Sequence, residues 1–107
     1  MEKYRFSCYN YQEFGDIRIE RYGVRLVILE SARKHGISDN DMIDVVDDPY
    51  VIKEMRVNPT KMMFLGFDSK ARAIEVITDT GTDGQVYVIH ADLITKQNDK
   101  LLEEVLL

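Results

Sequence analysis

The fold of this chain is decided by residues 61–91, which read KMMFLGFDSKARAIEVITDTGTDGQVYVIHA. The stretch holds three short runs rich in the β-branched and aromatic residues that strands favour. The runs are residues 61–67, 72–79 and 85–91. Turn-forming residues separate them, at Asp68-Ser69-Lys70 and at Thr80–Gly84. Because connections this short join antiparallel neighbours, we predict a meander of three antiparallel strands.

The preceding segment predicts a helix and a fourth strand. Ser38 is a natural N-cap, and Asp41 stands three residues later, where an acidic side chain stabilises the first turn. Asp48-Pro49 ends the helical pattern, because a proline disfavours helical backbone in the residue before it. Residues 50–57 then form a strand that ends at Asn58-Pro59.

Residues 24–35 fit two interpretations. Their strand propensity is high, yet their apolar residues also fall on a helical stripe. The stripe consists of Val24, Val27, Ile28 and Ala32. Gly36 supplies a left-handed stop, and the basic residues Arg33 and Lys34 suit the negative end of a helix dipole. We therefore predict a helix over residues 24–35.

Both ends of the chain carry further elements. Residues 3–11 alternate and are rich in tyrosine and phenylalanine, which predicts a strand, and residues 17–22 are expected to form a second hairpin arm. Residues 95–107 predict a final helix. Its apolar stripe is Leu101, Leu102, Val105 and Leu106. We favour core packing for this stripe over partner binding. The expected class is α+β, with a small antiparallel sheet packed against two or three helices in one domain.

Composition narrows the cellular context. The chain has 107 residues, a net charge of −5 and a single cysteine, Cys8, which has no partner for an internal disulfide. The first residues lack a signal-peptide pattern, and the longest apolar run, around residues 27–29, is far too short to span a bilayer. We therefore expect a cytoplasmic protein without a membrane partner. The negative charge also argues against a broad electrostatic grip on nucleic acid.

A block of acidic residues suggests a metal site, but the spacing of these residues does not match one. The block consists of Asp39, Asp41, Asp44, Asp47 and Asp48. It lacks the glycine and glutamate positions of a calcium loop, and the chain has no zinc-type cysteine and histidine pairs. We expect no metal and no cofactor. The same acidic helix would meet DNA phosphates unfavourably, so we expect no specific DNA recognition by this chain alone.

The candidate site residues are Arg33, Lys34, His35 and the second histidine, His90. An arginine fork, a lysine charge and a histidine that titrates near neutral pH form a plausible phosphate site with proton-transfer capacity. From spacing alone the favoured interpretation is structural, with solvated helix-end charges and a half-buried histidine in a strand. Between residues 86 and 91, His90 is in phase with Val86 and Val88 on one face.

Several short motifs together resemble the BrnT-like toxins of bacterial toxin–antitoxin systems, in order and spacing, over roughly residues 24–92. They are Ala32–Ser38, Asp48-Pro49, Phe64-Leu65-Gly66, Ile74–Ile77 and Val88–Ala91. The resemblance divides the chain into a β extension at residues 1–23, a toxin-like core at 24–92 and a C-terminal helix at 95–107. It implies a fold related to the RelE-type ribonucleases, RNA cleavage that inhibits translation, and an antitoxin partner.

The resemblance also assigns roles. Lys34 and His35 match the family's Lys-His-Gly motif, and Lys61 stands where the family places a basic residue before the Leu-Gly strand. His90 falls in the strand that reads Ser-Ala-Arg in the better-known toxins, although no arginine follows Ala91 here. The implied chemistry is metal-independent transesterification, with His35 and His90 as proton carriers and Arg33, Lys34 and Lys61 on phosphate. The alternative is a non-catalytic protein-interaction module of the same fold.

Overall fold

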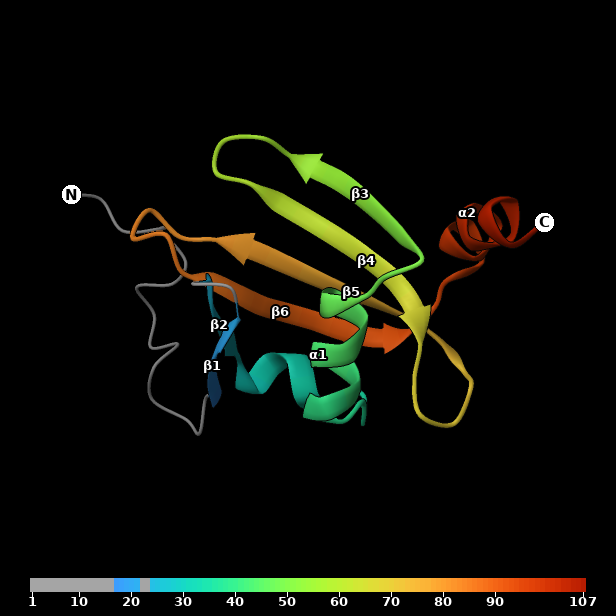
Figure 1. Ribbon diagram of the computed structural model, residues 1–107, viewed down its shortest axis with the longest axis horizontal. Coiled ribbons are helices and arrows are strands. Elements are labelled where there is room, and N and C mark those ends of the chain that lie inside the picture. Colours follow the sequence, from blue (N-terminus) through green and yellow to red (C-terminus); the bar gives the residue numbers. More distant parts are fainter. Residues whose placement is uncertain (1–16, 22–23) are drawn as a thin grey trace.

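The computed structural model describes residues 17–21 and 24–107, and the strand predicted over residues 3–11 lies outside these ranges. In the described part, six strands form one sheet in the order β1-β2-β6-β5-β4-β3 (Figure 1). The strands are β1 (Ile17–Arg21), β2 (Val24–Ile28), β3 (Val51–Arg56), β4 (Lys61–Phe67), β5 (Ala73–Thr80) and β6 (Val86–Leu93). The helices are α1 (Asp39–Asp47), α2 (Lys96–Leu106) and the short 3-10 helix η2 (Glu30–Arg33).

The predicted meander is confirmed. β3, β4, β5 and β6 follow one another in the sheet, and each is antiparallel to the next. β1 also pairs antiparallel with β2. β2 instead runs parallel to β6, with Leu26 opposite Val86 and Ile28 opposite Val88. The α+β class with two α-helices is therefore confirmed, and one parallel pairing makes the sheet mixed.

The helix predicted over residues 24–35 is wrong. Val24–Ile28 form strand β2, and only Glu30–Arg33 are helical, as a single 3-10 turn. β2 lies between β1 and β6, so its backbone groups find partners on both sides. Its later residues are buried against both faces, since Ile28 and Val27 belong to different core clusters. Val27 and Ile28, which fall on the apparent helical stripe, are thus residues of a strand that is covered on both faces.

Local signals around Gly36 act as predicted. Gly36 has a φ of 81°, in the left-handed region, and its N–H donates to the Arg33 carbonyl at 3.1 Å. The Ser38 hydroxyl accepts a hydrogen bond from the Asp41 N–H at 3.1 Å, which is the predicted N-cap. The chain therefore stops one short helix and starts the next within five residues, from Lys34 to Ser38.

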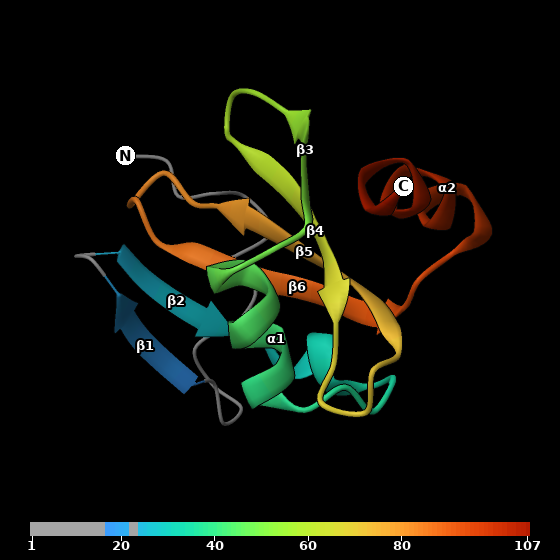
Figure 2. The ribbon, with the colours of Figure 1, turned by 45° about the vertical axis from the view of Figure 1, so that its right-hand side comes forward.

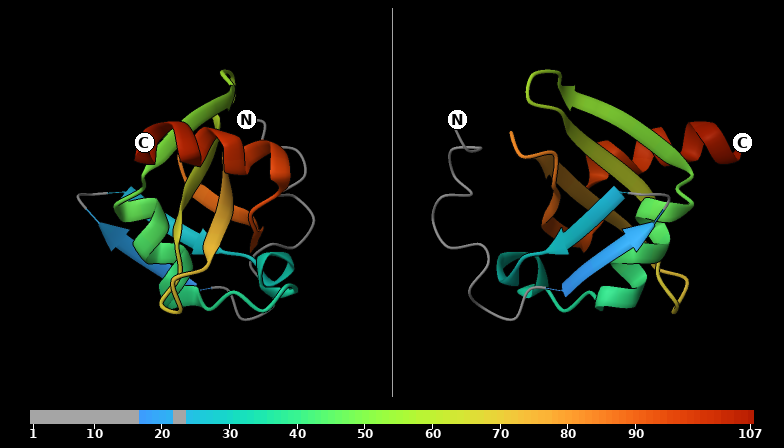
Figure 3. Two further views of the ribbon diagram at one scale, coloured as in Figure 1. Left: turned by 90° about the vertical axis from the view of Figure 1, so that its right-hand side faces the viewer. Right: turned by 60° about the vertical axis from the view of Figure 1, so that its left-hand side comes forward.

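The two α-helices cover opposite faces of the sheet. Met42, Ile43 and Val45 of α1 pack in a cluster with Ile74, Val76 and Val88. Leu102 of α2 packs in another cluster with Met63 and Leu65. Successive residues of a strand point to opposite faces, so the alternation along β4 and β5 separates an α1 face from an α2 face. Figures 2 and 3 show α1 and α2 apart, with the strands between them.

The C-terminal helix forms as predicted and is only partly covered. The Thr95 hydroxyl caps it by accepting from the Asn98 N–H at 3.4 Å. Leu102 is buried and Leu101 half-buried, whereas Val105 and Leu106 are exposed. The first half of the apolar stripe therefore packs in the core, as favoured above, and the second half faces solvent. In the described part of the chain, no helix has the length and apolar character needed to cross a membrane.

Candidate functional site

His90 points to the α2 face because β6 carries a bulge. Ile77 of β5 is opposite His90, but the next residue, Thr78, is opposite Val88, so Ile89 is the extra residue. Val88 therefore stays on the α1 face with its core cluster, while His90 moves to the other face. The phase predicted for His90 with Val86 and Val88 is wrong for this reason.

His35 lies just after η2, and η2 packs beside β6, the strand that carries His90. After β2 ends, η2 and the turn at Lys34 carry the chain past β6. The ring centroids of His35 and His90 lie 5.8 Å apart, and the rings meet edge-on at an interplanar angle of 69°. The two histidines that are distant in sequence are thus neighbours, and both rings are partly exposed to solvent.

Each histidine has its own carboxylate. Nε2 of His90 lies 3.3 Å from Oε2 of Glu75, whose side chain is only 6% exposed. Nδ1 of His35 lies 3.6 Å from Oδ2 of Asp92, which is more open to solvent. Glu75 and Asp92 are directly opposite each other in the β5–β6 pairing. We call these four residues the histidine–carboxylate cluster.

The predicted phosphate ligand Arg33 already binds two carboxylates. Its Nε donates to Asp39 at 2.9 Å, and its Nη1 donates to Glu30 at 2.7 Å. The side-chain hydrogen bond with Asp39 raises the pKa of Arg33, so the guanidinium stays charged. Arg33 therefore ties η2 to the start of α1. Phosphate binding by Arg33 stays a prediction. To bind phosphate, Arg33 would have to share or release its contact with Asp39 or Glu30.

The two lysines lie at different distances from the cluster. Lys34 is exposed and adjoins His35 in the chain. Lys61 begins β4 opposite Asp79, whereas His90 is opposite Ile77. Lys61 and His90 are separated by two strand spacings across the sheet and by two residues along β5. Their Cα atoms therefore lie about 12 Å apart. Lys61 alternates with Met63 and so faces the same side of the sheet as His90. Lys34 is the nearer cation for a ligand at the histidines.

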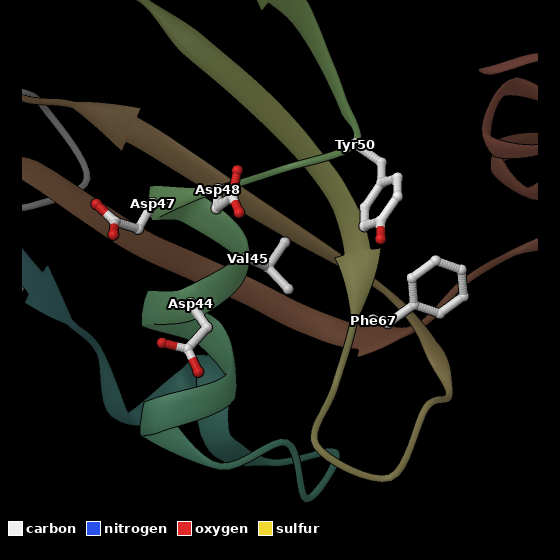
Figure 4. Close-up of a pocket in the computed structure, with 6 residues that line it drawn as sticks. All are labelled: Asp44, Val45, Asp47, Asp48, Tyr50 and Phe67. Carbon is white, nitrogen blue, oxygen red and sulfur yellow. The ribbon is translucent and has the colours of Figure 1, made fainter. Parts of the chain in front are cut away.

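A separate open hollow of about 360 Å³ lies between the end of α1 and the start of β3. Figure 4 shows Tyr50 and Phe67 on one side of it, with ring centroids 5.3 Å apart and edge-to-face. Asp44 and Asp47 line the other side, but their carboxylates point away from the rings in this view. α1 contributes Asp44, Val45 and Asp47 to this hollow, and the residues of the histidine–carboxylate cluster do not line it.

A buried ion pair lies further along β5. The carboxylate of Asp79 is 1% exposed and contacts the guanidinium of Arg56, whose Nε also donates to the Pro59 carbonyl at 2.9 Å. Burial raises the pKa of Asp79 to about 6, and the Thr80 N–H works against that rise. Arg56 thus supplies positive charge to a carboxylate that the protein interior would otherwise neutralise.

Comparison with known proteins finds no matching family model, no matching curated protein and no matching solved structure. The histidine–carboxylate cluster therefore has to be judged on its own chemistry. Within the described residues, no group of three or more histidine, cysteine, aspartate or glutamate side chains could hold a metal ion. What the cluster offers is two imidazoles side by side, each with a carboxylate.

The sequence pattern pointed to the two histidines but not to their carboxylate partners. Glu75 stands in the run Ile74-Glu75-Val76-Ile77, and an acidic residue inside an apolar strand was the available signal, because such a charge has to be compensated. Asp92 follows His90 at the end of β6 and carries no comparable signal. Their pairing with histidines depends on strand register, which the residues alone do not reveal.

Proposed function

We propose that this chain is a metal-independent endoribonuclease that acts as the toxin of a toxin–antitoxin system, as the resemblance to the BrnT-like toxins implies. The observation that supports the proposal is the meeting of His35 and His90, with ring centroids 5.8 Å apart. Two adjacent imidazoles with carboxylate partners match what RNA transesterification requires, namely one proton acceptor and one proton donor near a phosphodiester.

The reaction needs neither a metal nor an outside reactant. One histidine accepts the proton of the ribose 2′-hydroxyl, and the 2′-oxygen attacks phosphorus. The bond from phosphorus to the 5′-oxygen breaks, and the other histidine donates a proton to that oxygen. The products are a 2′,3′-cyclic phosphate and a 5′-hydroxyl. Which histidine plays which part stays open. Lys34, exposed beside His35, is the nearest candidate to stabilise charge on the phosphate.

Purified chain incubated with RNA in EDTA tests the proposal. We expect cleavage to 2′,3′-cyclic phosphate ends, and a loss of about 10²- to 10⁴-fold in rate for His35→Ala or His90→Ala. Lys34→Ala should mainly lower kcat, because the charge that Lys34 would stabilise develops on the phosphate in the transition state. Lys70→Ala is the control for the Lys34→Ala variant, since Lys70 is likewise an exposed lysine and lies in the turn before β5. A wild-type chain that neither cleaves RNA nor slows growth on expression contradicts the proposal, as does full activity without either histidine.

We further propose that an antitoxin encoded beside this chain holds it inactive in the cytoplasm. Co-expression with the neighbouring gene should restore growth, and the two products should purify together. The observation that favours a protein partner is the apolar end of α2, where Val105, Leu106 and Leu107 are exposed. The same observation supports the alternative, a non-catalytic interaction module of this fold. Partner binding without RNA cleavage by the free chain would select that alternative.

A further inference from the structure

Glu75 is a buried carboxylate shared between His90 and the start of α2. Its Oε1 accepts two hydrogen bonds, from the Thr95 N–H at 3.0 Å and from the Asn98 side-chain amide at 2.9 Å. Its Oε2 lies 3.3 Å from Nε2 of His90. One oxygen is thus occupied by α2, and the other faces the imidazole.

This geometry decides where the proton of neutral His90 sits. A carboxylate oxygen only accepts hydrogen bonds, so a favourable contact with Nε2 requires a hydrogen on that nitrogen. In the other tautomer, the lone pair of Nε2 would face the negatively charged Oε2 of Glu75, a nearly buried carboxylate. Nε2 of His90 therefore carries the hydrogen, and Nδ1 keeps the free lone pair. The groups around the ring are Glu75 from β5, His35 from the turn after η2, and Asp92 from β6, which faces His35.

We propose that Glu75 is the positioning residue of His90, which it holds as the Nε2–H tautomer so that Nδ1 is the atom that exchanges protons with substrate. The proposal rests on the function proposed above for its role in RNA cleavage. It adds the reactive atom and the residue that selects it. Thr95 and Asn98 in turn hold Glu75, so the start of α2 supports the tautomer without contacting the histidine ring.

Replacing Glu75 by glutamine separates this role from a merely structural one. The Glu75→Gln side chain keeps its length and can still accept from Thr95 and Asn98 with its oxygen. Its amide nitrogen would then face His90 and donate to Nε2, which reverses the tautomer. Asn98→Ala is the matched control, because the Thr95 N–H still holds Oε1 of Glu75 in that variant and Oε2 still faces His90.

The tautomer is measured directly by long-range proton–nitrogen correlation NMR of ¹⁵N-labelled protein at a pH where His90 is neutral. We expect an Nε2–H pattern in the wild type and in Asn98→Ala, and an Nδ1–H pattern in Glu75→Gln. RNA cleavage by Glu75→Gln should fall by about 10²-fold or more in kcat at unchanged KM, since a wrong tautomer costs this much or more in other enzymes.

Failure of this proposal can be told apart from failure of the proposed function. An Nδ1–H pattern for His90 in the wild type overturns the assignment whatever the RNA assay gives, and it needs no variant that has to fold. An Nε2–H pattern in a wild-type chain that cleaves no RNA supports the assignment at His90 and removes the enzyme. Unchanged kcat in a folded Glu75→Gln variant overturns the positioning role.

Discussion

Replacing Leu102 by alanine should loosen α2 without unfolding the sheet. Leu102 is 2% exposed and, of the residues of α2, all of which the structure describes, it is the buried one. It packs with Met63 and Leu65 of β4. Leu101 is partly buried against the same cluster, and Thr95 and Asn98 at the start of the helix donate two hydrogen bonds to Glu75. α2 is therefore held mainly by Leu102, with help from the partly buried Leu101 and from the hydrogen bonds to Glu75.

The expected cost can be estimated from these contacts. Truncating a buried leucine costs about 2–5 kcal/mol, and we take about 2.5 kcal/mol because α2 packs at the end of the sheet with its outer side in solvent. If this loss falls on the docking of α2 rather than on the whole fold, local opening becomes roughly 60-fold more frequent. Leu106→Ala, at a position 50% exposed, should change opening by about twofold or less.

Hydrogen–deuterium exchange read by peptide distinguishes these outcomes. In Leu102→Ala we expect the amides of residues 96–106 to exchange much faster, while those of β5 stay as protected as in the wild type. Exchange that rises equally in α2 and β5 would mean that α2 is part of the global folding unit, and unchanged exchange would mean that Leu102 anchors little. Either result would contradict a role for Leu102 as the anchor of a separately opening α2. RNA cleavage should fall as α2 undocks, because Glu75 then loses its hydrogen bonds from Thr95 and Asn98.

Two further changes test other parts of the fold. Arg56→Met should destabilise the protein by about 3 kcal/mol at pH 8, the low end for a broken buried pair since Arg56 is 40% exposed. The loss should shrink towards pH 5, because a carboxyl whose pKa is raised to about 6 costs stability only as pH rises from its unfolded value of 3.8. Urea denaturation at both pH values checks this, and an equal loss at each would be inconsistent with it. Ala71→Gly should stabilise by about 1 kcal/mol, because Ala71 has a φ of 63°. A lower Tm in that variant would speak against strain at this turn.

The sequence predicted most elements because their signals are local. Ser38 caps α1 with its own hydroxyl, and Gly36 adopts the left-handed backbone that an end of helix requires. Turn residues between residues 61 and 91 separate strands whose pairing follows from short connections. Such signals depend on a few neighbouring residues, so they can be recognised without knowing the rest of the molecule.

Long-range contacts decided what the sequence left open or predicted wrongly. Residues 24–28 carry apolar side chains that suit either a helix or a strand, and their pairing with β1 and β6 selected the strand. A bulge at Ile89 turned His90 to the α2 face, where register brings Glu75 beside it. Neither effect has a signal within the segment concerned.

The α+β class, the helix caps and the turns could thus be inferred from residues close together in the chain. The meeting of His35 with His90, and of each with a carboxylate, depends on the folded arrangement. Side-chain chemistry and backbone preference belong to single residues, whereas proximity depends on which strands pair and in what register. For His35 and His90 that register was set by β2 lying parallel to β6 and by one extra residue in β6.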